Sequence, residues 1–146
     1  MRLRPPSAWL IRALYAIGFG PLIGRLLLLL TTTGRKSGLP RTTPLQYEEI
    51  DGAIYVASAR GAQADWFRNV EANPRVRVRV KSCQFDGTAQ AITDPSRIAD
   101  FLELRLRRHP KMIGAILKSE RLPAAPSRAQ LEAYAARLAM VVIHPD

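Results

Sequence analysis

The middle of the chain alternates between apolar runs and turn residues in a way that is typical of a β-sheet. Residues 26–33 form a continuous apolar run that ends in three threonines, as expected for a strand buried on both faces. Residues 41–50 and 53–59 are predicted to be the next two strands, because the Asp-Gly pair between them is a hairpin signal. Pro44 lies inside the second strand, which is therefore expected at a sheet edge or at a bulge.

The later strands have equally clear patterns. Residues 75–80 place valines on one face and arginines on the other. The usual explanation of such an arginine face is exposure to solvent, and the alternative is attraction of an anionic cofactor or lipid. Residues 83–92 are predicted to pair back onto this strand, with Gly87 at a bulge or close approach and Cys83 as a small buried residue. Residues 138–143 close the chain as a buried strand.

Apolar residues at helical spacing predict short helices between and after the strands. Asp65 is the expected cap of a helix over residues 64–73, and Asp94 with Pro95 begins a helix that runs to Arg108. The apolar stripe within residues 112–117 is interpreted as core. A capping box of Ser127 and Gln130 begins the last helix, which carries Leu131, Tyr134 and Leu138.

The first 20 residues predict an amphipathic helix. Its apolar residues recur at helical spacing, and several arginines lie near them. The helix could pack over the sheet or lie on an anionic lipid surface. Glycines, a proline and arginines interrupt the apolar stretch before it reaches the ~20 residues that a membrane-spanning helix needs. We therefore expect one folded domain over residues 1–146, mainly β with flanking helices around a small closed sheet.

Charge and composition limit the classes of partner and of function that fit this sequence. The net charge of +10 favours a polyanionic partner such as a phosphorylated cofactor, an anionic membrane surface or nucleic acid. No RNA- or DNA-binding motif or interleaved aromatic pattern appears, so nucleic acid is not expected. A single cysteine excludes an intrachain disulfide and fits a reducing cytoplasm, and it leaves too few ligands for a structural zinc site. No hydrolytic triad or carboxylate pair is evident, which agrees with chemistry carried by a redox cofactor.

The turn between the first two strands is the strongest candidate site. Two glycines bound it, and it holds Arg35, Lys36 and Ser37, with Arg41 opening the next strand. Glycine-rich turns crowd backbone amides into anion-binding concavities, and arginine and lysine add matching charge. The turn is either a seat for phosphate or carboxylate groups or an ordinary hairpin made soluble by basic residues. It is not a nucleotide P-loop, because no Gly-Lys-Ser/Thr opens a helix.

Two sequence blocks resemble the deazaflavin-dependent nitroreductase family, also called flavin/deazaflavin oxidoreductases. The first reads TTTGRKSG-x-PR-x-x-PL from Thr31 to Leu45, and the second comprises Ala57-Ser58 with DWFRNVEANP from Asp65 to Pro74. Together they cover roughly residues 26–80. The resemblance implies a split β-barrel of the flavin-binding, pyridoxamine-phosphate-oxidase-like kind. It also implies the cofactor F-420, an 8-hydroxy-5-deazaflavin with an anionic phospholactyl polyglutamate tail.

The resemblance assigns roles to individual residues. Arg35, Lys36 and Arg41 would hold the tail, Trp66 and Asn69 would close the pocket, and Ser58, Tyr134 or solvent would donate a proton. The cofactor-binding residues that it implies are Gly34, Arg35, Lys36, Ser37, Arg41, Pro44, Leu45, Ala57, Ser58, Ala59, Trp66 and Asn69. The implied reaction is hydride transfer from the reduced cofactor to a quinone, an enone or a nitro compound.

The sequence departs from the nitroimidazole-reducing relatives at two places. Their C-terminal tyrosine cluster is reduced here to Tyr134, and the loop between Ser58 and Trp66 is short. Nitroreduction of that kind is therefore not favoured. FMN is an alternative cofactor, and a non-catalytic carrier of the cofactor, a fatty acid or haem is an alternative function. The chain is expected to be a monomer or a homodimer, cytoplasmic, with peripheral membrane contact through its N-terminal helix left open.

Overall fold

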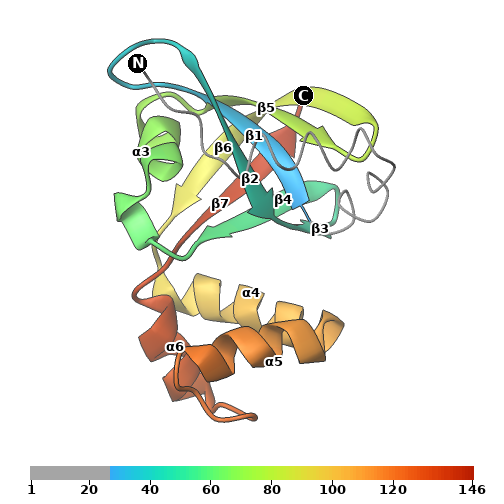
Figure 1. Ribbon diagram of the computed structural model, residues 1–146, viewed down its shortest axis with the longest axis vertical. Helices are drawn as coiled ribbons and strands as arrows, with labels where there is room; N and C mark the ends of the chain where they lie inside the picture. Colours follow the sequence, from blue (N-terminus) through green and yellow to red (C-terminus); the bar gives the residue numbers. More distant parts are fainter. Residues whose placement is uncertain (1–26) are drawn as a thin grey trace.

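The computed structural model describes residues 27–146, and within them one antiparallel sheet of seven strands holds most of the fold (Figure 1). The strand order is β2-β1-β5-β6-β7-β4-β3. The strands are β1 (Leu27–Thr33), β2 (Pro40–Gln46), β3 (Glu48–Ile50), β4 (Ala53–Ser58), β5 (Arg75–Val80), β6 (Cys83–Ile92) and β7 (Ala139–Pro145). The helices are the short 3-10 helix η2 (Gly61–Gln63), α3 (Asp65–Ala72), α4 (Pro95–Arg108), α5 (Pro110–Ser119) and α6 (Arg128–Ala135). The predicted N-terminal helix lies outside the described residues.

The two ends of the sheet are consecutive in the chain. β2 and β3 stand at opposite ends of the strand order, yet only Tyr47 separates them. The sheet therefore curls so that its ends meet at this corner. β3 pairs with β4 only from Ala53 to Tyr55, so no strand of the described chain pairs with β4 on that side from Val56 to Ser58. The result is a half barrel with a split between β2 and β4.

Except for Tyr47, residues 41–50 are in strands, as predicted, but they do not form one continuous strand. Tyr47 separates β2 from β3, because the chain turns there from one end of the sheet to the other. Pro44 lies in β2, which is an edge strand paired only with β1. A proline is tolerated there because an edge strand has one side without ladder hydrogen bonds. The edge prediction for Pro44 is confirmed.

β7 is buried on both faces and joins two hydrophobic cores. Ala139, Val141 and Ile143 belong to the core inside the half barrel, and Met140 and Val142 belong to the core under the helices. Successive strand residues point to opposite faces, so one strand can serve both cores. Figure 1 shows the consequence, since α4, α5 and α6 pack together at one end of the strand layer, where β7 begins.

The alternating strand β5 follows its prediction, with buried valines and exposed arginines. Gly87 on β6 also follows its prediction, because a Cβ there would come within 2.7 Å of the His144 carbonyl oxygen. The prediction for Cys83 is wrong. Cys83 is exposed, because it begins β6 directly after the turn from β5, before that strand reaches the core.

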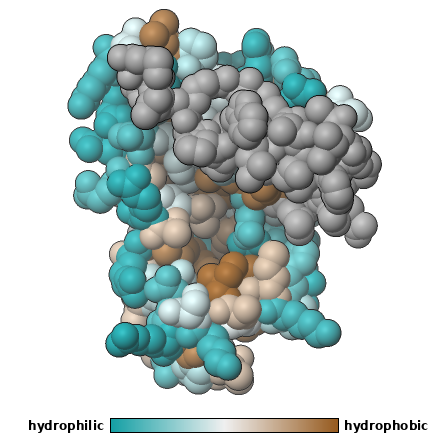
Figure 2. Space-filling model, viewed as in Figure 1, coloured by the Kyte–Doolittle hydropathy of each residue, from teal (hydrophilic) through white to brown (hydrophobic). Residues whose placement is uncertain are grey.

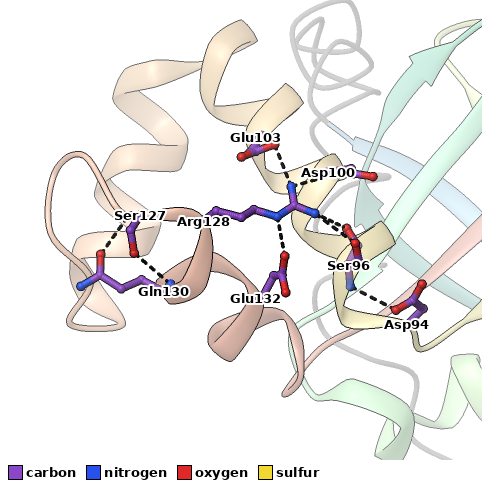
Figure 3. Close-up of polar contacts among 8 residues, drawn as sticks. All are labelled: Asp94, Ser96, Asp100, Glu103, Ser127, Arg128, Gln130 and Glu132. Atoms are coloured by element: carbon purple, nitrogen blue, oxygen red, sulfur yellow. Dashed lines mark hydrogen bonds and ion pairs between the residues drawn. The ribbon is translucent and has the colours of Figure 1, made fainter.

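A single arginine fastens α6 to α4 (Figure 3). The Arg128 guanidinium lies 2.8 Å from carboxylate oxygens of Asp100 and Glu103 on α4 and 2.6 Å from Glu132 on its own helix. It also donates to the carbonyl oxygen of Ser96 at 2.9 Å. Next to it, the predicted capping box of Ser127 and Gln130 is present, and Asp94 caps α4 by accepting from the Ser96 amide. These contacts fix the helical layer below the barrel.

The predicted cap of α3 is wrong. Ala64 occupies the N-cap position, and Asp65 is the first helical residue. The Asp65 carboxylate does not cap the helix because it pairs with Arg35, 3.1 Å away. Across the described chain, no helix is both long enough and apolar enough to cross a lipid bilayer.

Candidate functional site

A cavity of about 570 Å³ opens in the split between β2 and β4. Its lining comes from both sides of the split, from the start of α3 and from the helical layer. The lining residues are Leu27, Thr43, Pro44, Leu45, Gln46, Ala57, Ser58, Ala59, Arg60, Ala64, Asp65, Trp66, Leu102, Arg105, Ile113, Ile116, Leu117, Tyr134 and Leu138. Figure 2 shows hydrophobic surface gathered over α5 and in the hollow between it and the strands. Small-molecule sites of roughly 300–1,000 Å³ have this largely apolar character.

The apolar stripe of α5 forms one wall of this cavity. Ile113 and Leu117 are buried, as predicted, whereas Ile116 is 37% exposed and lines the opening. The interpretation of the whole stripe as core is therefore wrong for Ile116. An apolar stripe on a helix looks the same in sequence whether it faces a packed core or a cavity.

The structure brings most residues of the predicted ring-binding group together. Pro44 and Leu45 of β2, the segment from Ala57 to Ala59 and Trp66 of α3 all line the cavity, and so does Tyr134 of α6. β4 pairs with β7 along its length, but no described strand pairs with its other side beyond Tyr55, so the backbone at Ala57 and Ser58 borders the opening. The resemblance expected backbone amides at that place.

The residues predicted to hold an anionic tail lie outside the cavity lining, in the turn between β1 and β2 and, for Arg41, at the start of β2. In Figure 1 this turn projects at the upper left, above α3. Gly34 donates its amide to the Leu39 carbonyl, and Gly38 donates to the Gly34 carbonyl, both at 2.8 Å. These two amides close the turn itself. β2 leads directly from this turn into the cavity wall at Thr43.

Arg35 and Asn69 connect the turn to α3. The Arg35 side chain donates to the Asn69 amide oxygen at 2.8 Å and pairs with Asp65. The Arg35 backbone amide donates to the same Asn69 oxygen, and the Asn69 nitrogen donates to the Thr32 hydroxyl at 3.2 Å. Asn69 is buried and does not line the cavity. Both residues therefore hold the turn against α3.

Lys36 and Arg41 have no carboxylate partner among residues 27–146. Lys36 is exposed, while Arg41 is half-buried and donates to the Ser37 hydroxyl at 3.1 Å. Lys36 in the turn and Arg41 near the start of β2 are the cations here that best suit an anionic ligand, because neither has a carboxylate partner among the described residues.

The two candidate proton donors differ in their surroundings. The Ser58 hydroxyl donates to the Gly61 carbonyl at 2.9 Å, so its proton is held by the loop. Tyr134 is buried, and burial raises the pKa of its phenol, with Glu120 adding to this rise and Arg137 opposing it. Tyr134 lines the cavity and is protonated at neutral pH, so it is placed to donate a proton, and its raised pKa makes it a weaker acid than a free tyrosine.

A buried polar cluster at the helical end of the cavity was not expected from the sequence. Arg105 of α4 donates to Glu48 at 3.0 Å and to Gln46 at 2.9 Å, and Arg105 and Gln46 line the cavity. Arg108 and His109 contact the same Glu48 carboxylate at 3.1 Å and 3.0 Å. The burial of Arg105 could have been predicted from its position, since Arg105 continues the helical stripe of Ile98, Phe101 and Leu102.

A family model of the F420H(2)-dependent quinone reductases matches residues 8–113 of this sequence. The chain belongs to this family. The match confirms the resemblance that the two sequence blocks indicate, and it spans the β1–β2 turn, both strands of the split and α4, which carries Arg105.

Relatives of this quinone reductase family agree with the assignment. The F420H(2)-dependent quinone reductase Rv1261c of Mycobacterium tuberculosis is 37% identical over 68 residues, which are 44% of this chain and 46% of the relative. The match therefore spans less than half of that protein. A solved F420-H2 dependent reductase, FDR-A, is 26% identical with a TM-score of 0.53 and covers 81% of this chain and 94% of its own.

The half barrel is shared more widely than the quinone reductase family. A Listeria innocua protein named after pyridoxamine 5′-phosphate oxidase has a TM-score of 0.57 at 16% identity, and the match covers 94% of each chain. This likeness concerns the fold alone. It confirms the predicted class, a mainly β half barrel of the pyridoxamine-phosphate-oxidase-like kind with flanking helices.

Proposed function

We propose that this protein is an F-420-dependent reductase that transfers a hydride from the reduced cofactor to a quinone or a similar electron-poor acceptor. The observation that carries the proposal is the cavity in the split between β2 and β4, in a chain of the quinone reductase family. The named relatives support the choice of cofactor and acceptor.

The cavity fits the flat ring system of a deazaflavin. Pro44 and Leu45 provide an apolar side, and the opposite side is the strand backbone from Ala57 to Ala59. Backbone groups at a strand edge can donate and accept hydrogen bonds without a side chain, as the polar rim of such a ring requires. Trp66 adds an aromatic wall at the α3 end. The side chains and backbone groups that line the cavity therefore suit the shape and the polarity of the deazaflavin ring system.

The charged turn fits the tail of the same molecule. Lys36 and Arg41 lie just before the point where β2 enters the cavity wall, so one elongated ligand could contact both places. Arg41 and Leu45 are four residues apart on one strand, or about 13 Å. Phosphate and carboxylate groups are the partners that these side chains prefer.

The cofactor would supply the redox chemistry, and the chain would position the cofactor and supply a proton donor. When bound, the reduced deazaflavin supplies a hydride to the acceptor. The apolar residues of α4 and α5 would exclude water from the place of transfer. Tyr134 would donate the proton that completes the two-electron reduction, since it lines the cavity and is protonated at neutral pH. The Ser58 hydroxyl would hold the loop around Gly61 instead.

Gel filtration after mixing with cofactor tests the proposal directly. Purified protein is incubated with F-420 or with FMN, and the absorbance of the protein peak shows which molecule is retained. We expect F-420 to be retained and FMN to be lost, because only F-420 has a tail long enough to bring several carboxylates to Lys36 and Arg41. Retention of FMN alone would contradict the choice of cofactor.

A quinone panel separates a reductase from a carrier on the same barrel. Reduced F-420 bound to the protein is mixed with quinones, enones and nitro compounds, and cofactor absorbance is followed. We expect reoxidation by quinones above the rate without protein. Cofactor that is bound and never reoxidised would identify a carrier.

A further inference from the structure

Arg105 is a charged side chain in the wall of a mainly apolar cavity. It is 9% exposed, and its Nε and Nη2 donate to Glu48 at 3.0 Å and Gln46 at 2.9 Å. Among residues 27–146, no hydrogen bond uses its Nη1. The guanidinium carbon lies 5.9 Å from the centre of the Phe101 ring, which holds it from the α4 side. Arg105 is therefore fixed in place, with donor capacity left at the cavity.

The charges around Arg105 do not cancel. Glu48 is the one carboxylate of the described cluster, and both Arg105 and Arg108 contact it, with His109 as a third partner. Two guanidiniums against one carboxylate leave this end of the cavity positive. A positive charge shielded from water acts more strongly on a nearby anion than one on the surface.

The Arg105 end of the cavity and the charged β1–β2 turn lie at opposite ends of β2. Gln46 is the last residue of β2 and contacts Arg105, and Arg41 stands near the beginning of the same strand. The two positions are five residues apart, or about 17 Å. A cofactor that has its tail at Arg41 and its ring beside Leu45 and Ala57 leaves the space at Gln46 and Arg105 for a second molecule.

We propose that Arg105, with Gln46 beside it, binds the acceptor oxygen that becomes negative as the acceptor is reduced. This inference rests on the proposed function and deepens it by naming a residue for the acceptor. A quinone that receives a hydride gains two electrons and one hydrogen, and one of its oxygens is left as an anion. The Arg105 guanidinium stabilises that oxygen until it takes a proton from Tyr134 or water, which gives the quinol. The proton that remains on the oxidised cofactor is released to solvent.

Arg105 thus favours acceptors that place charge on an oxygen attached to a planar ring. A quinone does so at a single carbonyl oxygen, and a guanidinium donates to such an oxygen with fixed planar geometry. The rest of the acceptor lies against Ile113, Ile116 and Leu117, which suits an apolar ring.

The test uses binding without turnover. The probe is 2-hydroxy-1,4-naphthoquinone, which is an anion at neutral pH and resembles the reduced acceptor in charge, and 1,4-naphthoquinone is its neutral counterpart. Isothermal titration of each into the purified chain without reductant measures the preference for the anion. Arg105→Gln should weaken anion binding on the order of tenfold to a hundredfold, the loss expected for one charge-assisted hydrogen bond. Binding of the neutral probe should change much less.

Arg108→Gln is the matched control. It removes the same charge and another partner of Glu48, yet Arg108 does not line the cavity. It should weaken anion binding much less than Arg105→Gln does, because Arg108 adds to the local charge but does not line the cavity. An equal loss in both variants would overturn the inference, because general damage to the cluster would then explain it.

A second variant keeps the test informative if Arg105→Gln does not fold. The double variant Glu48→Gln with Arg105→Met removes both charges together, so no carboxylate is left without its nearest partner. It should also lose the preference for the anionic probe. An unchanged preference would contradict the role of Arg105.

F-420 titration separates this inference from the proposed function. Arg105→Gln should bind F-420 as the wild type does, and a loss of F-420 affinity would mean that Arg105 serves the cofactor and not the acceptor. Quinone reduction by F-420 without any effect of Arg105 on the probe would refute the inference and leave the function intact. Probe binding at Arg105 with no F-420 binding would refute the function and leave the site intact.

Discussion

The three cations in and just after the β1–β2 turn have different roles. Arg35 is bound to Asn69 and Asp65 and holds the turn on α3. Lys36 and Arg41 have no carboxylate partner among the described residues and are available to an anionic ligand. The sequence could not distinguish the three, because the two partners of Arg35, namely Asp65 and Asn69, lie 30 and 34 residues further along the chain.

Removing the two available cations should weaken cofactor binding. Lys36→Ala with Arg41→Ala is expected to lower the affinity for F-420 well over tenfold, since each charge-assisted hydrogen bond contributes about 1.5–3 kcal/mol. Cofactor fluorescence during titration measures the change. Arg79→Ala with Lys111→Ala removes the same charge from exposed positions outside the cavity and should have a much smaller effect. Equal losses in the two double variants would indicate nonspecific attraction.

Tyr134 gives stability a pH dependence with a defined sign. Burial raises its pKa above the ordinary value of 10.0. A group whose pKa is raised on folding stabilises the protein below its ordinary pKa, and this contribution is lost as the pH rises through the raised value. Tyr134→Phe should therefore lose less stability than the wild type between neutral pH and pH values above about 10. Urea unfolding across this range measures the difference, and parallel curves for both proteins would contradict it.

At the level of helices and strands, the sequence pattern predicts single strands, but it does not predict where the two ends of the sheet come together. The alternating pattern of β5 and the edge position of Pro44 follow from period and from proline chemistry, and both are as predicted. The break at Tyr47 was not predictable, because it depends on where the sheet ends meet. The bounds of β6 agree with the prediction, and the error at Cys83 concerns burial, because the first residues of the strand lie beside the turn from β5 and are exposed.

The ion pairs of Arg128 hold α6 against α4. Arg128 stands in the first turn of α6, where the helix dipole disfavours a cation, and its carboxylate partners Asp100, Glu103 and Glu132 offset that effect. Arg128→Ala should lower the melting temperature by several degrees and loosen the helix that carries Tyr134. Thermal unfolding followed by circular dichroism measures it. Arg107→Ala, an exposed arginine of α4, is the control, and an equal shift there would contradict this role of Arg128.

At the scale of the whole molecule, the site exists because two cores meet around an incomplete barrel. One core fills the half barrel and the other lies under the helices, and β7 connects them. The split between β2 and β4 is left between these cores, and α5 covers it with apolar residues. The family resemblance pointed to six residues that line the cavity, namely Pro44, Leu45, Ala57, Ser58, Ala59 and Trp66. The Arg105 cluster was not, since Gln46 and Arg105 meet only when the sheet curls back onto α4.

If the cavity in this split holds the cofactor, a side chain that fills the cavity should abolish binding. Ala57→Trp places a large side chain in the cavity wall, and Ala91→Trp adds the same side chain to an exposed position of β6 outside the cavity. Fluorescence titration with F-420 compares both folded variants with the wild type. We expect Ala57→Trp to lose F-420 binding and Ala91→Trp to keep it. Wild-type affinity in Ala57→Trp would show that the cofactor binds elsewhere.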